Sequence, residues 1–468
     1  MSDLQQRNAG TLSVWKRMAF GVAGASDGLM INCVNSMAAQ VLNICLAVNP
    51  ALVSVAIFIP RLWDALTDPV MGSISDNTRT RFGRRRPFVL IGGLLTALMY
   101  IVLWRFPFVS SEAGYFAWFL LASLVYYTCY TVFSVPYNAL SYELSPDYNE
   151  RTRIMAFKCA FGAAAGLLVQ WQFRLTQLDC FENTLDGMRT VSVGVAVIMG
   201  LGVLFPVFFL KERFAHEVST QQKIRLIDSL KEALCNRSFR LLIIAVILIC
   251  LGLYMVMQFG LYINIYHVYQ GDKQGAATIM GIGGTVYHIL GGILAAPIVS
   301  WVASHVGKRR TLIGGLLLAM IGSLSKFVTF DPRWPYLQLL SMVLMAPGLS
   351  CLWILAPSMV ADICDEDELE YGTRREGMFS AVYTNVLKIG GSIGLLIVGF
   401  LLNASGFDAE LGVDQPPHTM LILRSFFAGV PALGLFGAVL LILRFPITPE
   451  KAEQTRLTLA QRHEVSVG

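Results

Sequence analysis

Long apolar segments recur along the whole chain, and each is long enough to cross a membrane. A helix needs about 20 mostly apolar residues to span a bilayer, so twelve such helices use roughly half of the chain. The segments run without the two-residue alternation of a membrane β-barrel strand. The sequence therefore predicts an all-α membrane protein with twelve transmembrane helices. These are expected at about 19–44, 49–75, 87–107, 114–141, 154–174, 188–210, 238–268, 276–304, 311–330, 336–361, 378–404 and 420–445.

The composition excludes several other classes of protein. Only 14% of the 468 residues are charged, whereas a soluble domain carries about 25%. The net charge of +5 is not concentrated into the basic surface that nucleic-acid binding needs. The nine cysteines have no spacing typical of zinc sites or a disulfide framework. We therefore expect no nucleic-acid partner and no cofactor beyond a coupling ion, and the polar start of the chain predicts no cleavable signal sequence.

Charge in the loops predicts the orientation, because Lys and Arg are retained on the cytoplasmic side. Basic residues follow the second, fourth, eighth and tenth apolar segments, whereas the loops between them are poor in Lys and Arg. This alternation predicts that both termini are cytoplasmic in a multi-pass plasma membrane protein, which suits a bacterial inner membrane.

A polar stretch at 211–240 divides the chain into two halves of six segments. It predicts an N-terminal bundle at 1–210, a cytoplasmic middle loop at 211–240, a C-terminal bundle at 241–446 and a cytoplasmic tail at 447–468. The halves share a weak echo, since residues 83–86 read Gly-Arg-Arg-Arg and residues 307–310 read Gly-Lys-Arg-Arg. Two pseudo-symmetric six-helix bundles are the plan of the major facilitator fold. The alternative is that both basic runs serve topology alone.

Two aspartates lie inside the second apolar segment. Asp64 and Asp68 are four residues apart, which places them on one face of a helix. Because a carboxylate at the centre of a span costs about 2.5–3.5 kcal/mol, the pair requires a cation: Na⁺, or a proton held because like charges raise each other's pKa. The alternatives are a salt bridge to Arg61 or a position near the cytoplasmic interface.

Lys388 lies inside the eleventh segment, where a lysine is as costly as a carboxylate. A partnership with Asp64 or Asp68 is the simplest prediction, and snorkelling to the interface is the alternative. The fourth segment carries hydroxyl and amide side chains that suit a sugar but also form ordinary hydrogen bonds between membrane helices. His267 and His288 are expected to have ordinary structural roles.

An acidic run closes the tenth segment. Its residues include Asp362 and Asp365, with Arg375 just beyond. One interpretation is a solvated cytoplasmic charge cluster. The second interpretation is a gate. Acidic residues of this half would pair with basic loops of the other half, and the pairs would break when the cytoplasmic side opens. The predicted gating residues are Arg84, Arg151, Asp362, Asp365 and Arg375.

These motifs resemble the glycoside-pentoside-hexuronide:cation symporter family, which includes the melibiose permease. The resemblance covers essentially the whole chain. It rests on Trp-Asp-Ala-Leu-Thr-Asp-Pro at 63–69, Arg-Thr-Arg-Phe-Gly at 79–83, and on Asp362, Asp365, Arg375 and Lys388.

The resemblance implies a cation site of Asp64 and Asp68 with Thr67 and Thr131. Thr67 stands where the melibiose permease has an asparagine, so Na⁺ and H⁺ both remain open. At the sugar site, Ser134 and Asn138 replace an aspartate and a tryptophan, and Lys158 lies next to a family arginine position. Losing acids while keeping lysines suggests a different and anionic sugar. The implied substrate-binding residues are Tyr130, Ser134, Asn138, Lys158, Trp353, Thr384, Lys388 and Asp27.

The sequence thus predicts a monomeric, non-enzymatic symporter that carries a glycoside, pentoside, hexuronide or sulfo-sugar with Na⁺ or H⁺ by alternating access. A lipid-type symporter on the same fold is the first alternative. The second is a Mg²⁺-dependent membrane prenyltransferase using the acidic motifs.

Overall fold

The computed structural model describes residues 12–106, 111–144, 148–210, 232–372, 375–408 and 411–467. Every regular element in these ranges is a helix. Twelve of the helical stretches are long and apolar enough to cross a membrane. The predicted all-α class and the twelve spans are therefore confirmed.

The chain divides into two compact units. The first comprises residues 1–222 with 273–282 and 408–410, and the second comprises the rest. Residues 211–231 of the predicted middle loop lie outside the described residues, so the predicted domain boundaries stay a prediction. The cytoplasmic placement of the termini also stays a prediction.

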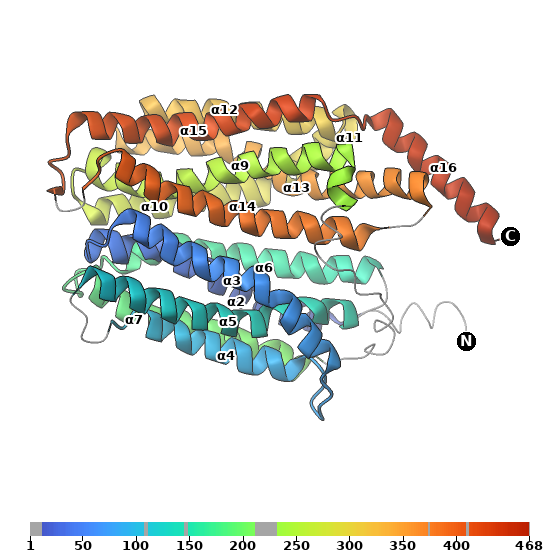
Figure 1. Ribbon diagram of the computed structural model, residues 1–468, viewed down its shortest axis with the longest axis horizontal. Coiled ribbons are helices and arrows are strands. Elements are labelled where there is room, and N and C mark those ends of the chain that lie inside the picture. Colours follow the sequence, from blue (N-terminus) through green and yellow to red (C-terminus); the bar gives the residue numbers. More distant parts are fainter. Residues whose placement is uncertain are drawn as a thin grey trace. The chain divides into compact units, whose positions relative to one another are not determined.

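The first unit holds six long helices that lie side by side (Figure 1). A π-helical segment, η1 at Ala39–Cys45, extends the first of them. The six helices are α2 (Val14–Ala38), α3 (Pro50–Asn77), α4 (Arg86–Leu103), α5 (Glu112–Leu144), α6 (Tyr148–Leu175) and α7 (Thr184–Phe209).

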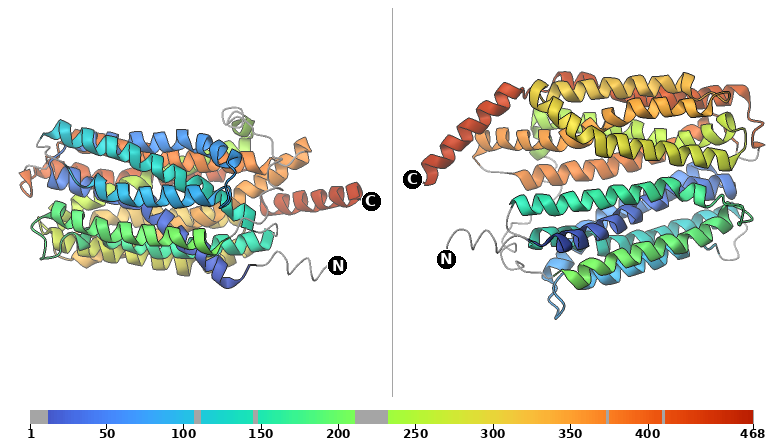
Figure 2. Two further views of the ribbon diagram at one scale, coloured as in Figure 1. Left: turned by 90° about the horizontal axis from the view of Figure 1, so that it is seen from below. Right: turned by 180° about the vertical axis from the view of Figure 1, so that it is seen from behind.

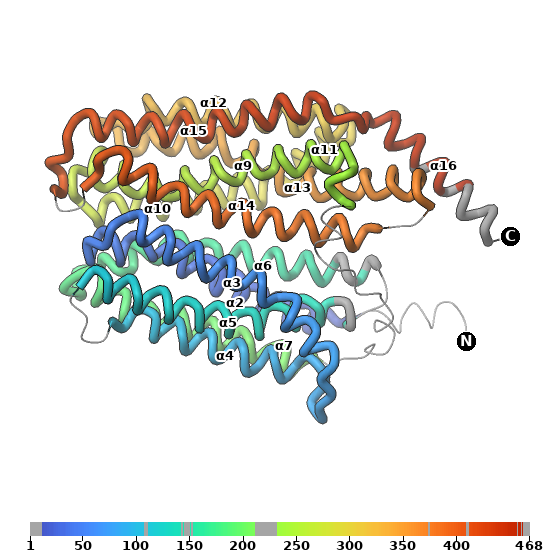
Figure 3. The backbone as a smooth tube through the Cα atoms, viewed as in Figure 1, coloured from blue at the N-terminus to red at the C-terminus, as the bar shows by residue number. Residues whose placement is uncertain are grey.

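The second unit repeats this plan, as the chain trace shows (Figure 3). Its second span is composite, because a π-helical turn, η3 at His288–Leu294, joins two α-helices. A polar helix, α16, follows the last span (Figure 2). The second span begins with α10 (Lys273–Tyr287), whose residues 273–282 group with the first unit. The other elements are α9 (Arg237–Tyr262), η2 (Ile263–Val268), η3, α11 (Ala295–Val306), α12 (Lys308–Thr329), η4 (Pro335–Leu337), α13 (Gln338–Tyr371), α14 (Glu376–Ala404), α15 (Pro417–Leu443) and α16 (Pro449–Val467).

The same helix pairings build both units. In the first, α2 packs on α6 and α7, α5 packs on α3 and α4, and α4 packs on α7. In the second, α9 packs on α14 and α15, α13 packs on α11 and α12, and α12 packs on α15. Numbered within its unit, each helix has the same partners, so the predicted pseudo-symmetry of the two bundles is confirmed.

The sequence echo has a structural counterpart in each unit. Gly83 and Gly307 both have positive φ, 106° and 92°, a conformation that favours glycine. Arg86, at the start of α4, donates to the Val207 carbonyl near the end of α7. Arg309, at the start of α12, donates to the Ile442 carbonyl near the end of α15. In each unit an arginine within three residues of this glycine therefore satisfies one of the last carbonyls of the sixth helix, which a helix leaves without partners, although Arg86 and Arg309 differ by one position in the echo.

Candidate cation and substrate site

Asp64 lies on α3 and is buried, with 1% of its surface exposed. The Thr131 hydroxyl on α5 donates to its Oδ1 over 2.7 Å. Thr67, one turn along α3, lies 3.2 Å from Thr131 through the two hydroxyl oxygens. The structure thus brings together three of the four predicted cation-site residues. All of their functional atoms are oxygens, the ligands that hard cations prefer.

Asp68 lies half-buried one turn beyond Asp64 on the same helix. Arg61, one turn before Asp64, donates to the Ile31 carbonyl over 3.0 Å. Its guanidinium carbon lies 5.3 Å from the centre of the Tyr127 ring. A backbone carbonyl of α2 and an aromatic ring of α5 thus hold this arginine beside the two aspartates.

A second cluster joins three helices of the first unit. The Lys158 ammonium on α6 lies 3.0 Å from Asp27 Oδ2 on α2, and it also donates to Asn138 Oδ1 on α5. The Tyr130 hydroxyl donates to Asp27 Oδ1 over 2.9 Å. Four predicted substrate-binding residues therefore meet at one place. A fifth, Ser134, is buried and accepts the Asn138 amide through its backbone carbonyl.

Sequence reasoning missed the glycine that makes this cluster possible. A Cβ on Gly24 of α2 would lie 2.8 Å from Lys158 Cγ and 3.0 Å from the Lys158 carbonyl oxygen. Gly24 therefore lets α2 approach α6 closely enough for Asp27, almost one turn later, to reach Lys158. The signal in the sequence is the small-residue run Gly-Val-Ala-Gly-Ala-Ser at 21–26, which is typical of close helix packing in membranes.

Consecutive residues of α5 connect the two clusters. Tyr130 binds Asp27, and Thr131 binds Asp64. A change in the charge at Asp64 therefore acts on a helix turn that also positions Asp27.

The remaining predicted substrate residues belong to the second unit. Lys388 is half-buried on α14, and Thr384, one turn earlier, is exposed and donates to the Ser380 carbonyl. Trp353 on α13 is 42% exposed, and its indole lies near the Tyr287 hydroxyl. The predicted partnership of Lys388 with Asp64 or Asp68 stays a prediction.

Several predicted gating residues form ion pairs inside one unit. Lys308 Nζ lies 2.6 Å from Asp362 Oδ2. Arg375 binds both carboxylate oxygens of Asp367, at 2.8 and 2.6 Å, and this hydrogen bonding raises the pKa of Arg375 above its ordinary value. Arg84 donates to the Asp76 carbonyl, and Asp365 lies half-buried on α13. The side chain of Arg151 lies outside the described residues.

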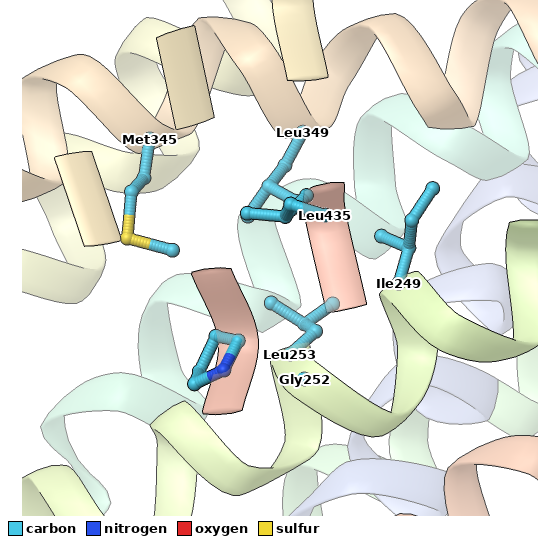
Figure 4. A pocket seen from close by; sticks show the side chains of 7 residues that line it. Ile249, Gly252, Leu253, Met345, Leu349 and Leu435 are labelled. Carbon is cyan, nitrogen blue, oxygen red and sulfur yellow. The ribbon is translucent and has the colours of Figure 1, made fainter. Parts of the chain in front are cut away.

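A small apolar pocket lies between α9, α13 and α15 of the second unit, as Figure 4 shows. Its lining is entirely aliphatic apart from Met345 and Pro431, and includes Ile249, Leu253 and Leu435. None of the predicted site residues lines it. The pocket therefore has no groups with which to orient a polar solute.

Comparison with known proteins decides the family. A family model described as MFS/sugar transport protein matches residues 19–449. The chain belongs to this family. It is therefore a major facilitator transporter of the symporter type and not an enzyme, and the prenyltransferase alternative is wrong. The resemblance to the melibiose permease-like symporters is confirmed.

The names of the related proteins point to different substrates. An uncharacterized symporter of Synechocystis sp. is 25% identical over 98% of this chain and 99% of its own. The sodium-dependent lysophosphatidylcholine symporter 1 of Gallus gallus is 24% identical over 97% of this chain and 90% of its own. The glucuronide carrier protein homolog of Escherichia coli is 24% identical over 89% of both chains.

The fold itself matches solved transporters. A bacterial homologue of the human lysosomal transporter Spinster, in an inward-facing and unoccupied conformation, has a TM-score of 0.69 at 13% identity and covers 96% of this chain and 98% of its own. This likeness supports the major facilitator fold and carries no information about substrate.

Proposed function

We propose that this protein is a cation-coupled symporter for a glycoside, with hexuronides included. The observation that carries the proposal is the pairing of Thr131 with Asp64 and of Tyr130 with Asp27 on adjacent residues of α5. A cation bound at Asp64, Asp68, Thr67 and Thr131 neutralises buried carboxylate charge. It thereby steadies the part of α5 that presents Tyr130 and, about two turns later, Asn138 to the substrate.

The Asp27 cluster suits sugar hydroxyls. Asp27 and the Asn138 side chain offer acceptors, and Lys158 and Tyr130 offer donors, all held by mutual hydrogen bonds. Planar polar groups of this kind bind vicinal hydroxyls. Because Asp27 neutralises Lys158, this cluster adds no net positive charge. The basis for expecting an anionic sugar is therefore Lys388 alone.

The coupling energy is sufficient for active uptake. One cation that moves down a membrane potential of 100 mV releases about 2.3 kcal/mol. Since 1.36 kcal/mol corresponds to a factor of ten, this supports an accumulation of about fiftyfold. The mechanism needs no covalent chemistry. The cation and the substrate bind together, and the loaded protein then closes on one side of the membrane and opens on the other.

A lysophospholipid is the second candidate substrate. The match of the Gallus gallus lysophosphatidylcholine symporter over 97% of this chain favours it. An Asp27–Lys158 pair of zero net charge also fits a zwitterionic headgroup, whose cation would replace Lys158 beside Asp27 and the Tyr137 ring, 5.1 Å from Lys158 Nζ.

The test is uptake by purified protein in liposomes under an imposed Na⁺ or H⁺ gradient. Labelled methyl-β-D-glucuronide, methyl-β-D-glucoside and lysophosphatidylcholine are compared. Gradient-dependent uptake of either glycoside supports the proposal. Uptake of the lysolipid alone overturns the sugar assignment and supports the second candidate. Equal uptake with and without both gradients overturns cation coupling.

A further inference from the structure

The second unit holds a histidine at the level that Asp64 occupies in the first unit. The repeat of the helix pairings makes α3 the counterpart of the α10–η3–α11 span, and α5 the counterpart of α13. Thr67 on α3 contacts Thr131 on α5. In the same way, the Gly291 carbonyl in η3 accepts the Ser350 hydroxyl of α13 over 2.8 Å. Asp64 precedes Thr67 by three residues, and His288 precedes Gly291 by three.

Thr131 on α5 and Ser350 on α13 also lie at similar positions along their helices. A Cβ on Gly92 of α4 would lie 2.6 Å from the Phe133 nitrogen, two residues beyond Thr131. A Cβ on Gly315 of α12 would lie 2.5 Å from Cys351 Sγ, one residue beyond Ser350. The close contacts of the third and fourth helices therefore place Thr131 and Ser350 within one helical turn of equivalence.

The His288 ring is oriented with one nitrogen available. Its Nδ1 lies 2.8 Å from the Gly284 carbonyl oxygen. Because a carbonyl only accepts, Nδ1 carries the proton and Nε2 is left as an acceptor. Among the hydrogen bonds of the described residues, none involves Nε2. His288 is also the first residue of the π-helical turn η3, and such turns are frequent at functional sites.

His288 does not share the outward face of its helix. One turn later Gly291 is buried against Ser350 and Ala346, and Ala295 and Val299 continue the buried side. The exposed side carries Ile293 and Ile298, which are 66% and 60% exposed. An imidazole inside a span is costly when it faces lipid, and the half-buried His288 avoids that face.

Two aromatic residues complete the surroundings. The Tyr287 and His288 ring centres are 5.7 Å apart, with the ring planes at 78°, and the Trp353 indole lies near the Tyr287 hydroxyl. Aromatic faces beside an acceptor recognise a sugar, because its C–H face packs on a ring while its hydroxyls donate.

We propose that His288 is a substrate-contacting residue, which accepts a substrate hydroxyl at Nε2 beside Tyr287 and Trp353. This inference rests on the proposed symport function and narrows the substrate to a solute that carries a hydroxyl donor. In the second unit, His288 would then be a polar contact at the position that corresponds to Asp64 in the first unit.

Two variants separate hydrogen bonding from packing. His288→Gln keeps an acceptor near the position of Nε2, whereas His288→Leu removes it. Counterflow of methyl-β-D-glucuronide needs no cation gradient and reports KM directly. We expect His288→Leu to raise KM by about ten- to a hundredfold, because the substrate hydroxyl loses its acceptor in a partly buried place. We expect His288→Gln to stay within about threefold of the wild type. An unchanged KM in His288→Leu, or equal damage in both variants, overturns the proposal.

A labelling experiment decides the inference even if no glucuronide is transported. Purified His288→Cys and Ile293→Cys proteins are treated with a charged methanethiosulfonate, and modification at each position is read by peptide mass spectrometry, so native cysteines can stay. We expect Cys modification at position 288 and none at 293, where the side chain faces lipid. Equal lack of reaction at both positions overturns the role of His288. Absence of glucuronide transport with reaction at 288 instead overturns the sugar proposal.

Discussion

Asp27 and Lys158 form an ion pair between α2 and α6, with 3.0 Å between Oδ2 and Nζ. Their side chains are only 13% and 18% exposed, so each charge depends on the other for its stability in a region of low dielectric constant. The pair therefore sets both the charge and the shape of the substrate cluster in the first unit.

Neutralising one member of this pair is expected to destabilise the protein more than neutralising both. Lys158→Met leaves the Asp27 carboxylate without its cation, which costs about 3 kcal/mol for a largely buried pair. Asp27→Asn combined with Lys158→Met removes both charges and is expected to recover most of that loss. Thermal unfolding of the wild type and the two purified variants checks this, and a double variant less stable than Lys158→Met contradicts it.

Thr131→Val is expected to weaken cation binding. It removes the 2.7 Å hydrogen bond to Asp64 and a hydroxyl ligand while nearly preserving side-chain volume. A hydrogen bond to a charged group contributes about 1.5–3 kcal/mol, so the cation concentration for half-maximal uptake should rise roughly ten- to a hundredfold.

Two controls accompany this variant. Thr131→Ser keeps the hydroxyl and should resemble the wild type. Thr128→Val alters a threonine that accepts from the Trp63 indole instead, and it should leave the cation dependence unchanged. A rise in cation requirement for Thr128→Val as large as for Thr131→Val would mean that general packing, not the Asp64 contact, is responsible.

Gly24→Ala is expected to reduce stability and substrate affinity together. The added Cβ would lie within 3.1 Å of Lys158 Cγ, carbonyl oxygen and Cα, so α2 and α6 must separate, and overpacking of this kind costs about 1–3 kcal/mol. Gly28→Ala is the matched control, since its Cβ would meet no atom closer than 3.7 Å. Melting temperature and counterflow KM are the measurements, and equal behaviour of the two variants contradicts the close-approach argument.

Glu150→Gln is expected to loosen the start of the chain. Glu150 is fully buried and accepts from Arg17 Nε and Nη2 at 2.6 and 2.9 Å and from the Leu12 backbone nitrogen. Removing its charge leaves Arg17 unpaired, at a cost of about 3 kcal/mol. The exposed Glu112→Gln should change the free energy of unfolding by less than about 0.5 kcal/mol. Faster amide exchange at residues 12–20 in Glu150→Gln, and not in Glu112→Gln, checks the prediction.

Much of the fold was predictable because the bilayer imposes it. A span must be helical and about 20 residues long, so hydropathy alone indicates all twelve helices. The polar stretch at 211–240 predicted the two halves, and the weak basic echo at 83–86 and 307–310 lies in each half where an arginine, Arg86 or Arg309, donates to a carbonyl near the end of the sixth helix. The π-helical turn at His288 was not predictable, because it changes one hydrogen-bond register without changing hydropathy.

The site was only partly predictable, for a physical reason. Four-residue spacing placed Asp64 and Asp68 on one face, but which helix faces them depends on packing, and Thr131 was reached only through the family resemblance. The pairing of Lys158 with Asp27 crosses from α6 to α2. It depends on the absence of a side chain at Gly24, which no charge or hydropathy pattern reports.

The most direct test of the central claim is the gradient-driven accumulation ratio of Asp64→Asn and Asp68→Asn beside the wild type in liposomes. The substrate is the one that the uptake comparison identifies, and counterflow serves as the control for folding and substrate binding. If these carboxylates hold the coupling cation, both variants exchange substrate in counterflow but accumulate none against its gradient. Accumulation at the wild-type ratio in both variants would contradict the account.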